Sequence, residues 1–372
     1  MQEHPLQGPL TEDQVFVLCV LHDIGAYKTE EIDRMLDFEL RTPKSHAIYG
    51  YLFLKYMSDL GDSAEAILHH HTDFNMPVLQ RTRYAEYAQL IHLADRVDIL
   101  TQAQPQADWH TLQRFAGTQF GPALVDALLR AQEKHDIRAD LCSGDYATKQ
   151  DRYIQTMAIN APNVISYLKM LVYAIDFRSE VTVTHTATTT AITMELARLL
   201  ELPREIWPAL ELGAFLHDVG KIAIPVEILK KPDRLTDAEM DIMRRHVVYS
   251  GEIIEGMVSE EIQQIAIRHH EKINGSGYPC GLCASELTQP QRIVAVADVM
   301  SALGGKRSYK DSFPREKILS ILTEMRNSGQ LCPIVSGVAI NHYDEIMANT
   351  AVKNAPILQM YEKMHAEYKR LA

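Results

Sequence analysis

Residues Leu216–Gly220 read LHDVG, and a near copy, LHDIG, stands at Leu21–Gly25, 195 residues earlier. Three landmarks follow each copy in the same order: a single histidine, an adjacent histidine pair, and an aspartate within an apolar stretch. They are His46, His70, His71 and Asp95 after the first copy and His246, His269, His270 and Asp298 after the second, at offsets of 200, 199 and 203 residues. Four landmarks in one order at nearly one offset predict two tandem copies of one domain.

Around these landmarks the apolar residues recur at the spacing of an α-helix. Thr236 and Glu239 form a capping box for a helix that we expect to run through His246. The stretch VTVTHTATTTAIT at 181–193 favours extended structure by propensity. The helical period of the following MELARLLEL leads us to expect a helix there instead. The predicted fold is all-α, with two tandem helical bundle domains at 1–138 and 164–372 and a connection at 139–163.

Composition limits the possible functions. The 372 residues carry 49 acidic and 37 basic side chains, a formal charge of −12, so we expect no polymeric nucleic acid as a partner. No apolar run approaches the roughly 20 residues that span a bilayer, and the first residues do not resemble a signal peptide. Five dispersed cysteines fit a reducing compartment. These features predict a cytoplasmic protein without a membrane span.

The second copy gathers imidazole and carboxylate side chains that suit a metal centre. A carboxylate directly after a histidine can bridge two cations, which is the role we expect of Asp218. Ligands of this kind suit iron, manganese, cobalt or nickel, and zinc also fits. Two such cations can clamp a phosphodiester and hold a hydroxide nucleophile, while Lys221 is placed to reach the phosphate. The candidate metal ligands are His185, His217, Asp218, His246, His269, His270 and Asp298.

Three stretches of the second copy carry a resemblance to a known family. They read HDVGKIAIP at 217–225, HHEKINGSGYPCGL at 269–282 and RIVAVADVMSAL at 292–303. From about 185 to 343 the chain resembles the HD-GYP family of cyclic-dinucleotide phosphodiesterases, a subgroup of the HD hydrolases. The resemblance implies two divalent metal ions, with iron or manganese preferred, on the ligands named above. It also implies catalytic roles for Asp218 and Lys221 and substrate contacts at Lys221, Tyr278, Arg307 and Lys310.

The resemblance implies cleavage of a 3'3' cyclic dinucleotide, cyclic di-GMP or the hybrid cyclic GMP-AMP, to the linear dinucleotide and onward to mononucleotides. Asn274 and Ser301 stand where the family often has aspartate, which keeps the hybrid dinucleotide as a candidate. Some members hold a third metal through a glutamate one turn before the first histidine, but Val181 stands four residues before His185. We therefore expect two metal ions.

The first copy lacks part of the set. Ala26 replaces the lysine, TDFNMPVLQ at 72–80 replaces the GYP loop, and a counterpart of His185 would fall 32 residues before His22, ahead of the first residue of the sequence. We expect a degenerate domain that hydrolyses poorly and serves packing, dimerisation or regulation, which leaves a homodimer open. The residues that could form a vestigial metal site are His22, Asp23, His46, His70, His71 and Asp95.

Two alternative functions stay open at this stage. One is a general nucleotide phosphohydrolase of the wider HD superfamily, against which the GYP loop speaks. The other is a non-catalytic scaffold that senses a dinucleotide or binds a partner protein. Cys280 and Cys283 form a CxxC pattern, but they follow the GYP loop, so we interpret the pattern as a chance spacing in a loop.

Overall fold

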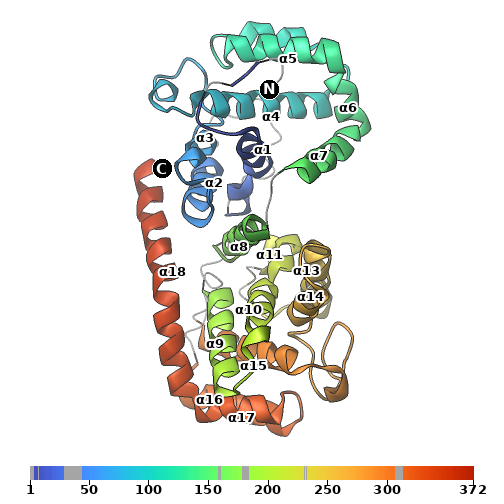
Figure 1. Ribbon diagram of the computed structural model, residues 1–372, viewed down its shortest axis with the longest axis vertical. Coiled ribbons are helices and arrows are strands. Elements are labelled where there is room, and N and C mark those ends of the chain that lie inside the picture. The colour runs from blue at the N-terminus through green and yellow to red at the C-terminus, as the bar shows by residue number, and fades with distance from the viewer. Residues whose placement is uncertain are drawn as a thin grey trace. The chain divides into compact units, whose positions relative to one another are not determined.

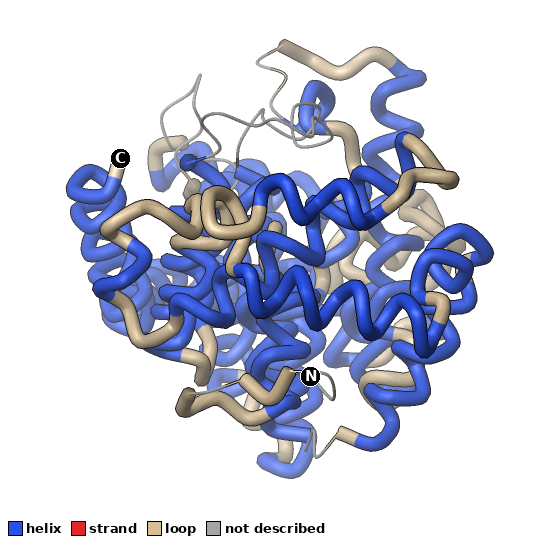
Figure 2. Tube along the Cα trace, turned by 90° about the horizontal axis from the view of Figure 1, so that it is seen from above, coloured by secondary structure: helices blue, strands red, loops and turns tan. Residues whose placement is uncertain are grey.

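The computed structural model describes residues 4–6, 8–28, 44–157, 161–177, 184–229, 231, 233–305 and 313–372. Within these ranges the regular structure is helical and no strand forms (Figure 2), so the prediction of an all-α fold is confirmed. No described helix combines the length and apolar character needed to cross a bilayer. Arg307 and Lys310, predicted to contact substrate, lie outside the described residues.

The chain divides into two compact units, one made of Met1–Met170 with Met364–Ala372 and the other of Leu171–Lys363. In the first unit lie α1 (Glu12–Leu21), α2 (Lys44–Met57), α3 (Glu65–Leu68), α4 (Ala85–Ala103), α5 (Pro122–His135), α6 (Ile137–Ser143) and α7 (Asp145–Thr156) (Figure 1). In the second lie α9 (His185–Leu199), α10 (Trp207–Leu216), α11 (Val226–Leu229), α12 (Asp237–Arg244), α13 (His246–Ile254), α14 (Glu260–Ile267), α15 (Gln289–Gly304), α16 (Arg315–Asn327) and α17 (Pro333–Asn341). Two helices, α8 (Ala161–Phe177) and α18 (Tyr343–Leu371), contribute to both units. The segment 139–163, expected as a connection, contains α7; the domain boundaries stay a prediction.

Each unit has its own apolar core. In the first unit, α4 and α5 pack around Trp109 and Phe120, which are almost fully buried. In the second, α15 supplies the centre of the core: its buried Ile293 and Val296 pack with residues of α9, α10 and α17. Asp298 lies on the same helix, so the packing that holds α15 also fixes the position of this carboxylate.

The helix at the threonine-rich segment forms as predicted, whereas the helix that follows Thr236 is shorter than predicted. The threonine-rich segment is helical from His185, as expected: Thr186, Thr189 and Thr193 lie on one buried face of α9, where packing outweighs their strand propensity. The capping box of Thr236 and Glu239 is present, but its helix does not continue through His246. Helix α12 ends at Arg244, Arg245 forms a turn, and α13 begins at His246.

A glycine in each LHDxG motif allows a helix to approach closely. A Cβ on Gly220 would lie 2.0 Å from the carbonyl oxygen of His246 and 2.4 Å from the amide nitrogen of Ser250. A Cβ on Gly25 would lie 2.0 Å from the carbonyl oxygen of His46 in the same way. In the second unit the contact is reinforced, since the Ser250 hydroxyl accepts from the Gly220 amide at 2.9 Å and donates to the His217 carbonyl at 2.9 Å. The motif glycine therefore sets the spacing between the Asp218 turn and α13.

We predict that Gly220→Ala destabilises the second unit by about 3 kcal/mol, because the added methyl group would overlap backbone atoms that cannot rotate away. Gly337→Ala is the matched control: Gly337 lies within α17, and a Cβ there meets nothing within 4 Å. Alanine at this helical position should raise stability by about 0.5–1 kcal/mol. Thermal and urea unfolding compare the two variants. Equal stabilities would contradict the packing argument.

Candidate metal centre

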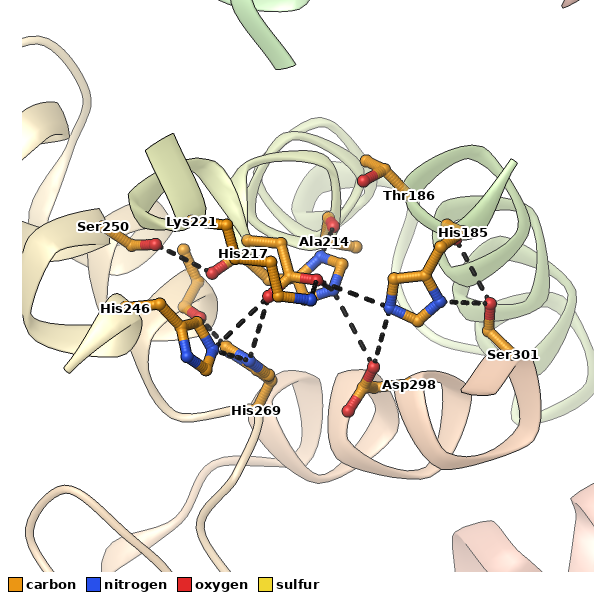
Figure 3. Close-up of polar contacts among 12 residues, drawn as sticks. His185, Thr186, Ala214, His217, Lys221, His246, Ser250, His269, Asp298 and Ser301 are labelled. Carbon is orange, nitrogen blue, oxygen red and sulfur yellow. Dashed lines mark hydrogen bonds and ion pairs between the residues drawn. The ribbon is translucent and has the colours of Figure 1, made fainter. Parts of the chain in front are cut away.

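The predicted metal ligands of the second unit lie close together, and Figure 3 shows His185, His217, His246, His269 and Asp298 directed toward one another. Helix termini supply nearly all of them. His185 begins α9, His217 follows the last residue of α10, Asp218 precedes the short 3-10 helix at Val219–Ala223, and His246 begins α13. The pair His269 and His270 follows α14, and Asp298 projects from within α15.

The carboxylate of Asp218 lies between two groups of histidines. Its Oδ2 atom is 3.5 Å from Nε2 of His185 and 3.2 Å from Nε2 of His217. Its Oδ1 atom is 3.4 Å from Nε2 of His246 and 3.9 Å from Nε2 of His269. The two oxygens thus face different imidazole pairs, which is the arrangement expected of a carboxylate that bridges two cations.

Asp298 completes the ring of candidate ligands. Its Oδ1 atom is 3.1 Å from Nε2 of His185 and 3.8 Å from Nε2 of His217, and its Oδ2 atom is 3.6 Å from Nδ1 of His270. Two triads of side chains have ligand atoms close enough to share an ion. They are His185, His217 and Asp218, and His246, His269 and His270.

Backbone carbonyls fix the orientation of three imidazoles. Nδ1 of His217 is 2.7 Å from the carbonyl of Ala214, and His246 and His269 make the same contact with the residue three positions earlier, at 2.6 and 2.7 Å. Each Nδ1–H donates to its carbonyl, so each Nε2 carries a lone pair directed into the centre. This is the usual outer support of a metal-binding histidine.

Two buried atoms of the centre have no hydrogen-bond partner. They are Nε2 of His217 and Oδ1 of Asp218. Both are acceptors in the forms described above, and burying such groups without compensation is costly. Two bound cations, one beside His217 and one beside Oδ1 of Asp218, would satisfy these atoms. The chemistry of the donor set therefore fits divalent metal ions.

The histidines of the centre differ in their protonation. His269 and His270 are held neutral and so ready to bind a metal ion, whereas His185 is held protonated and must release its proton first. Burial and the neighbouring imidazoles hold the pKa of His269 well below its usual range, and burial lowers the pKa of His270 to about 4. Burial also lowers the pKa of His185, but Asp218 and Asp298 outweigh it and raise the pKa to about 9. A cation bound beside His185 would therefore displace a proton.

Lys221 contacts the carboxylate of Asp218 directly. Its ammonium group forms an ion pair with Oδ2 of Asp218. Burial raises the pKa of Asp218, but Lys221 and His217 outweigh it and hold the pKa well below the usual range. Asp218 is therefore ionised, and Lys221 lies at the site without being a metal ligand.

The GYP loop places Tyr278 beside the candidate ligands. The Tyr278 ring lies 4.7 Å from the ring of His270, and the guanidinium of Arg244 lies 5.5 Å from the Tyr278 ring. Buried Glu271 holds the loop by accepting from the amides of Cys280 at 2.7 Å and Leu282 at 2.9 Å. Our sequence reasoning missed Glu271 and Arg244, since neither belongs to the repeated landmarks.

Ser301 and Asn274 are both engaged within the protein. Ser301 Oγ lies 2.9 Å from Nδ1 of His185 and donates to the His185 carbonyl at 3.2 Å, so it orients a candidate ligand. Asn274 accepts from the amide of Ser276 at 3.1 Å within the GYP loop. Any effect of Ser301 on the reaction therefore runs through His185, and its influence on base preference stays a prediction.

The first unit repeats part of this geometry. Nε2 of His22 is 3.4 Å from Oδ2 of Asp23, and Nε2 of His46 is 3.6 Å from Oδ1 of Asp23. Nδ1 of His71 is 3.9 Å from Oδ2 of Asp95. The residues predicted as a vestigial site are thus brought together, and four of them, Asp23, His46, His70 and His71, have ligand atoms within 4.8 Å of one another.

Comparisons with known proteins agree with the repeat. Two family models, both described as HD domain, match residues 2–100 and 169–333. The 3'3'-cGAMP-specific phosphodiesterase 1 of Vibrio cholerae is 28% identical over 358 residues, 88% of this chain and 81% of that protein. The cyclic di-GMP phosphodiesterase response regulator RpfG of Xanthomonas campestris is 40% identical over 162 residues, 43% of each protein.

A solved structure shares the fold over most of the chain. The cyclic GMP-AMP specific phosphodiesterase V-cGAP3 of V. cholerae covers 91% of this chain and 88% of its own, with a TM-score of 0.53 and 18% identity. Each unit gathers a His-Asp pair, a single histidine, a histidine pair and an aspartate. The chain therefore contains two HD domains, one in each unit, and it is similar to phosphodiesterases that act on cyclic dinucleotides.

We predict that Ser301→Ala lowers the affinity of the second unit for Mn²⁺ by about 10- to 100-fold, because His185 loses the group that orients its ring. Ser336→Ala is the control, since Ser336 is equally buried in the same unit but donates to the Cys332 carbonyl at 2.6 Å. Calorimetric titration of the metal-free chains measures both affinities. An unchanged affinity in a folded Ser301→Ala variant would remove this role.

Proposed function

We propose that the second unit hydrolyses a 3'3' cyclic dinucleotide to the linear dinucleotide with two divalent metal ions, iron or manganese. The observation that carries the proposal is the position of Asp218, whose two buried oxygens face separate pairs of imidazoles. When bound, the two cations would neutralise the phosphodiester and activate the attacking water. His185, His217, Asp298 and Asp218 would hold one ion, and His246, His269, His270 and Asp218 the other.

The chain's own residues account for the remaining needs of the reaction. Lys221 supplies a fixed positive charge beside the bridging carboxylate. Tyr278, packed against His270, offers an aromatic face at the edge of the centre on which a base can stack. The guanidinium of Arg244, 5.5 Å from the centre of that ring, adds a positive charge beside it. Arg307 and Lys310 remain proposed substrate contacts on the strength of the family resemblance.

The names of the relatives support two candidate substrates. Similarity along nearly the whole chain to a phosphodiesterase named for 3'3'-cGAMP supports the hybrid dinucleotide. The match to RpfG, named for cyclic di-GMP, covers less than half of either protein. We therefore propose 3'3'-cGAMP as the preferred substrate and cyclic di-GMP as the competitor to be measured beside it.

A chromatographic assay tests the proposed reaction. The metal-free chain is loaded with Fe²⁺ under anaerobic conditions or with Mn²⁺ and given each cyclic dinucleotide, and the linear dinucleotide and mononucleotides are separated. We expect turnover with metal, none after chelation, and none for Asp218→Asn. Asp241→Asn, a change of an exposed aspartate on α12, is the control and should keep full activity. Binding of dinucleotide without hydrolysis by the loaded chain would identify a scaffold instead.

We further predict that Lys221→Met lowers the rate of hydrolysis about 100-fold or more, because one fixed charge that stabilises the transition state is lost. Metal content should not change, since Lys221 is not a ligand. Lys231→Met is the control: Lys231 pairs with Glu239 on α12 and should be dispensable. Steady-state kinetics and elemental analysis separate the effects. Full activity, or loss of metal from the folded variant, would contradict the proposed role.

A further inference from the structure

The first unit contains an apolar cavity of about 350 Å³ beside its core. The cavity lies between α4 and α5, which run alongside each other in Figure 1. Of the described residues that line it, only His4 and His135 have polar side chains, and Nε2 of His4 lies 2.5 Å from the carboxylate of Glu86. The aliphatic lining on the two helices is Leu90, Leu93, Ala94, Leu124, Leu128 and Ala131.

The repeat identifies α4 as the counterpart of α15, since Asp95 and Asp298 are equivalent and lie 203 residues apart. The same offset makes Ala94 the counterpart of Ala297. Ala297 is fully buried in the core of the second unit, whereas Ala94 is exposed in the first. An apolar helix face that one copy of the fold covers is therefore open in the other.

Helix α5 is likewise the counterpart of α17. Each begins with a proline, Pro122 or Pro333, and a glutamine stands three residues before that proline. In the second unit α9 packs against both α15 and α17. The cavity between α4 and α5 thus corresponds to the place that α9 takes. The described residues that precede α1 form no helix that could fill it.

We propose that this cavity binds an amphipathic α-helix of a partner protein, in the place that α9 takes against α15 and α17. Helix α9 buries Ile192 and Leu196, which lie four residues apart on one face. The partner helix presents aliphatic side chains at the same spacing. An apolar cavity of about 150 Å³ holds one benzene ring, so this one has room for roughly two or three aliphatic side chains. The inference does not depend on the proposed hydrolysis by the second unit.

Fluorescence anisotropy on the full chain tests the proposal, with a labelled synthetic peptide of residues 184–200 as the probe. This peptide contains α9 with both of its capping residues, and we expect it to bind at micromolar concentrations. A second peptide that carries Ile192→Asp and Leu196→Asp is the matched control. It should bind about 10-fold more weakly or less, because two charges would enter an apolar cavity.

Variants of the chain locate the binding. Ala131→Glu on α5 and Ala94→Glu on α4 each put a carboxylate at the cavity and should each weaken peptide binding about 10-fold or more. Ala123→Glu is the control, because Ala123 is exposed on α5 outside the cavity lining. It should bind the peptide as the unaltered chain does. Thermal unfolding shows which variants are folded. Absence of peptide binding, or equal binding by the folded cavity variants and Ala123→Glu, would overturn the proposal.

Sedimentation of the chain alone tests a second copy as the occupant. We expect Ala131→Glu and Ala123→Glu to sediment alike. A dimer that separates in Ala131→Glu but persists in Ala123→Glu would show that another copy of this chain fills the cavity. That result would overturn the assignment to a partner protein.

Discussion

The buried carboxylate of Asp218 imposes the main constraint on the second unit. Taking an ionised carboxylate out of water costs several kcal/mol unless positive charge and polar hydrogens surround it. Here Lys221 and the imidazoles around both oxygens provide that environment. Because nearly all these groups stand at helix termini, the helices must end or begin where the carboxylate lies. The apolar packing of α9, α10 and α15 fixes those positions, and Gly220 lets α13 approach.

The two units differ in which of the two equivalent carboxylates pairs with a lysine or arginine. In the second unit the fixed cation, Lys221, forms an ion pair with Asp218, while histidines surround Asp298. In the first unit the fixed cation, Arg96, sits on Asp95, while the ion pairs of Asp23 are with histidines. The fixed cation thus pairs with the aspartate after the histidine in one unit and with the aspartate of the apolar helix in the other.

The sequence was sufficient to predict the helical fold, the repeat and which side chains would meet, because each landmark has a fixed distance from the His-Asp pair. It did not predict the break between α12 and α13. At this break the backbone carbonyl of His246 packs closely against Gly220. Arg96 and Glu271 look like ordinary surface charges in sequence. Their burial depends on contacts between segments, and the same is true of the bond between Ser301 and His185.

These differences separate the capacity to bind metal from the capacity to catalyse. Binding requires only that helix termini direct imidazoles and a carboxylate at one point, and both units satisfy that requirement. In the proposed reaction, catalysis also uses Lys221 and the loop that holds Tyr278 against His270. That loop is held by Glu271, whose carboxylate accepts from two backbone amides. A copy of the domain can therefore lose the lysine and the loop while its helices, and the ligands at their ends, stay where packing puts them.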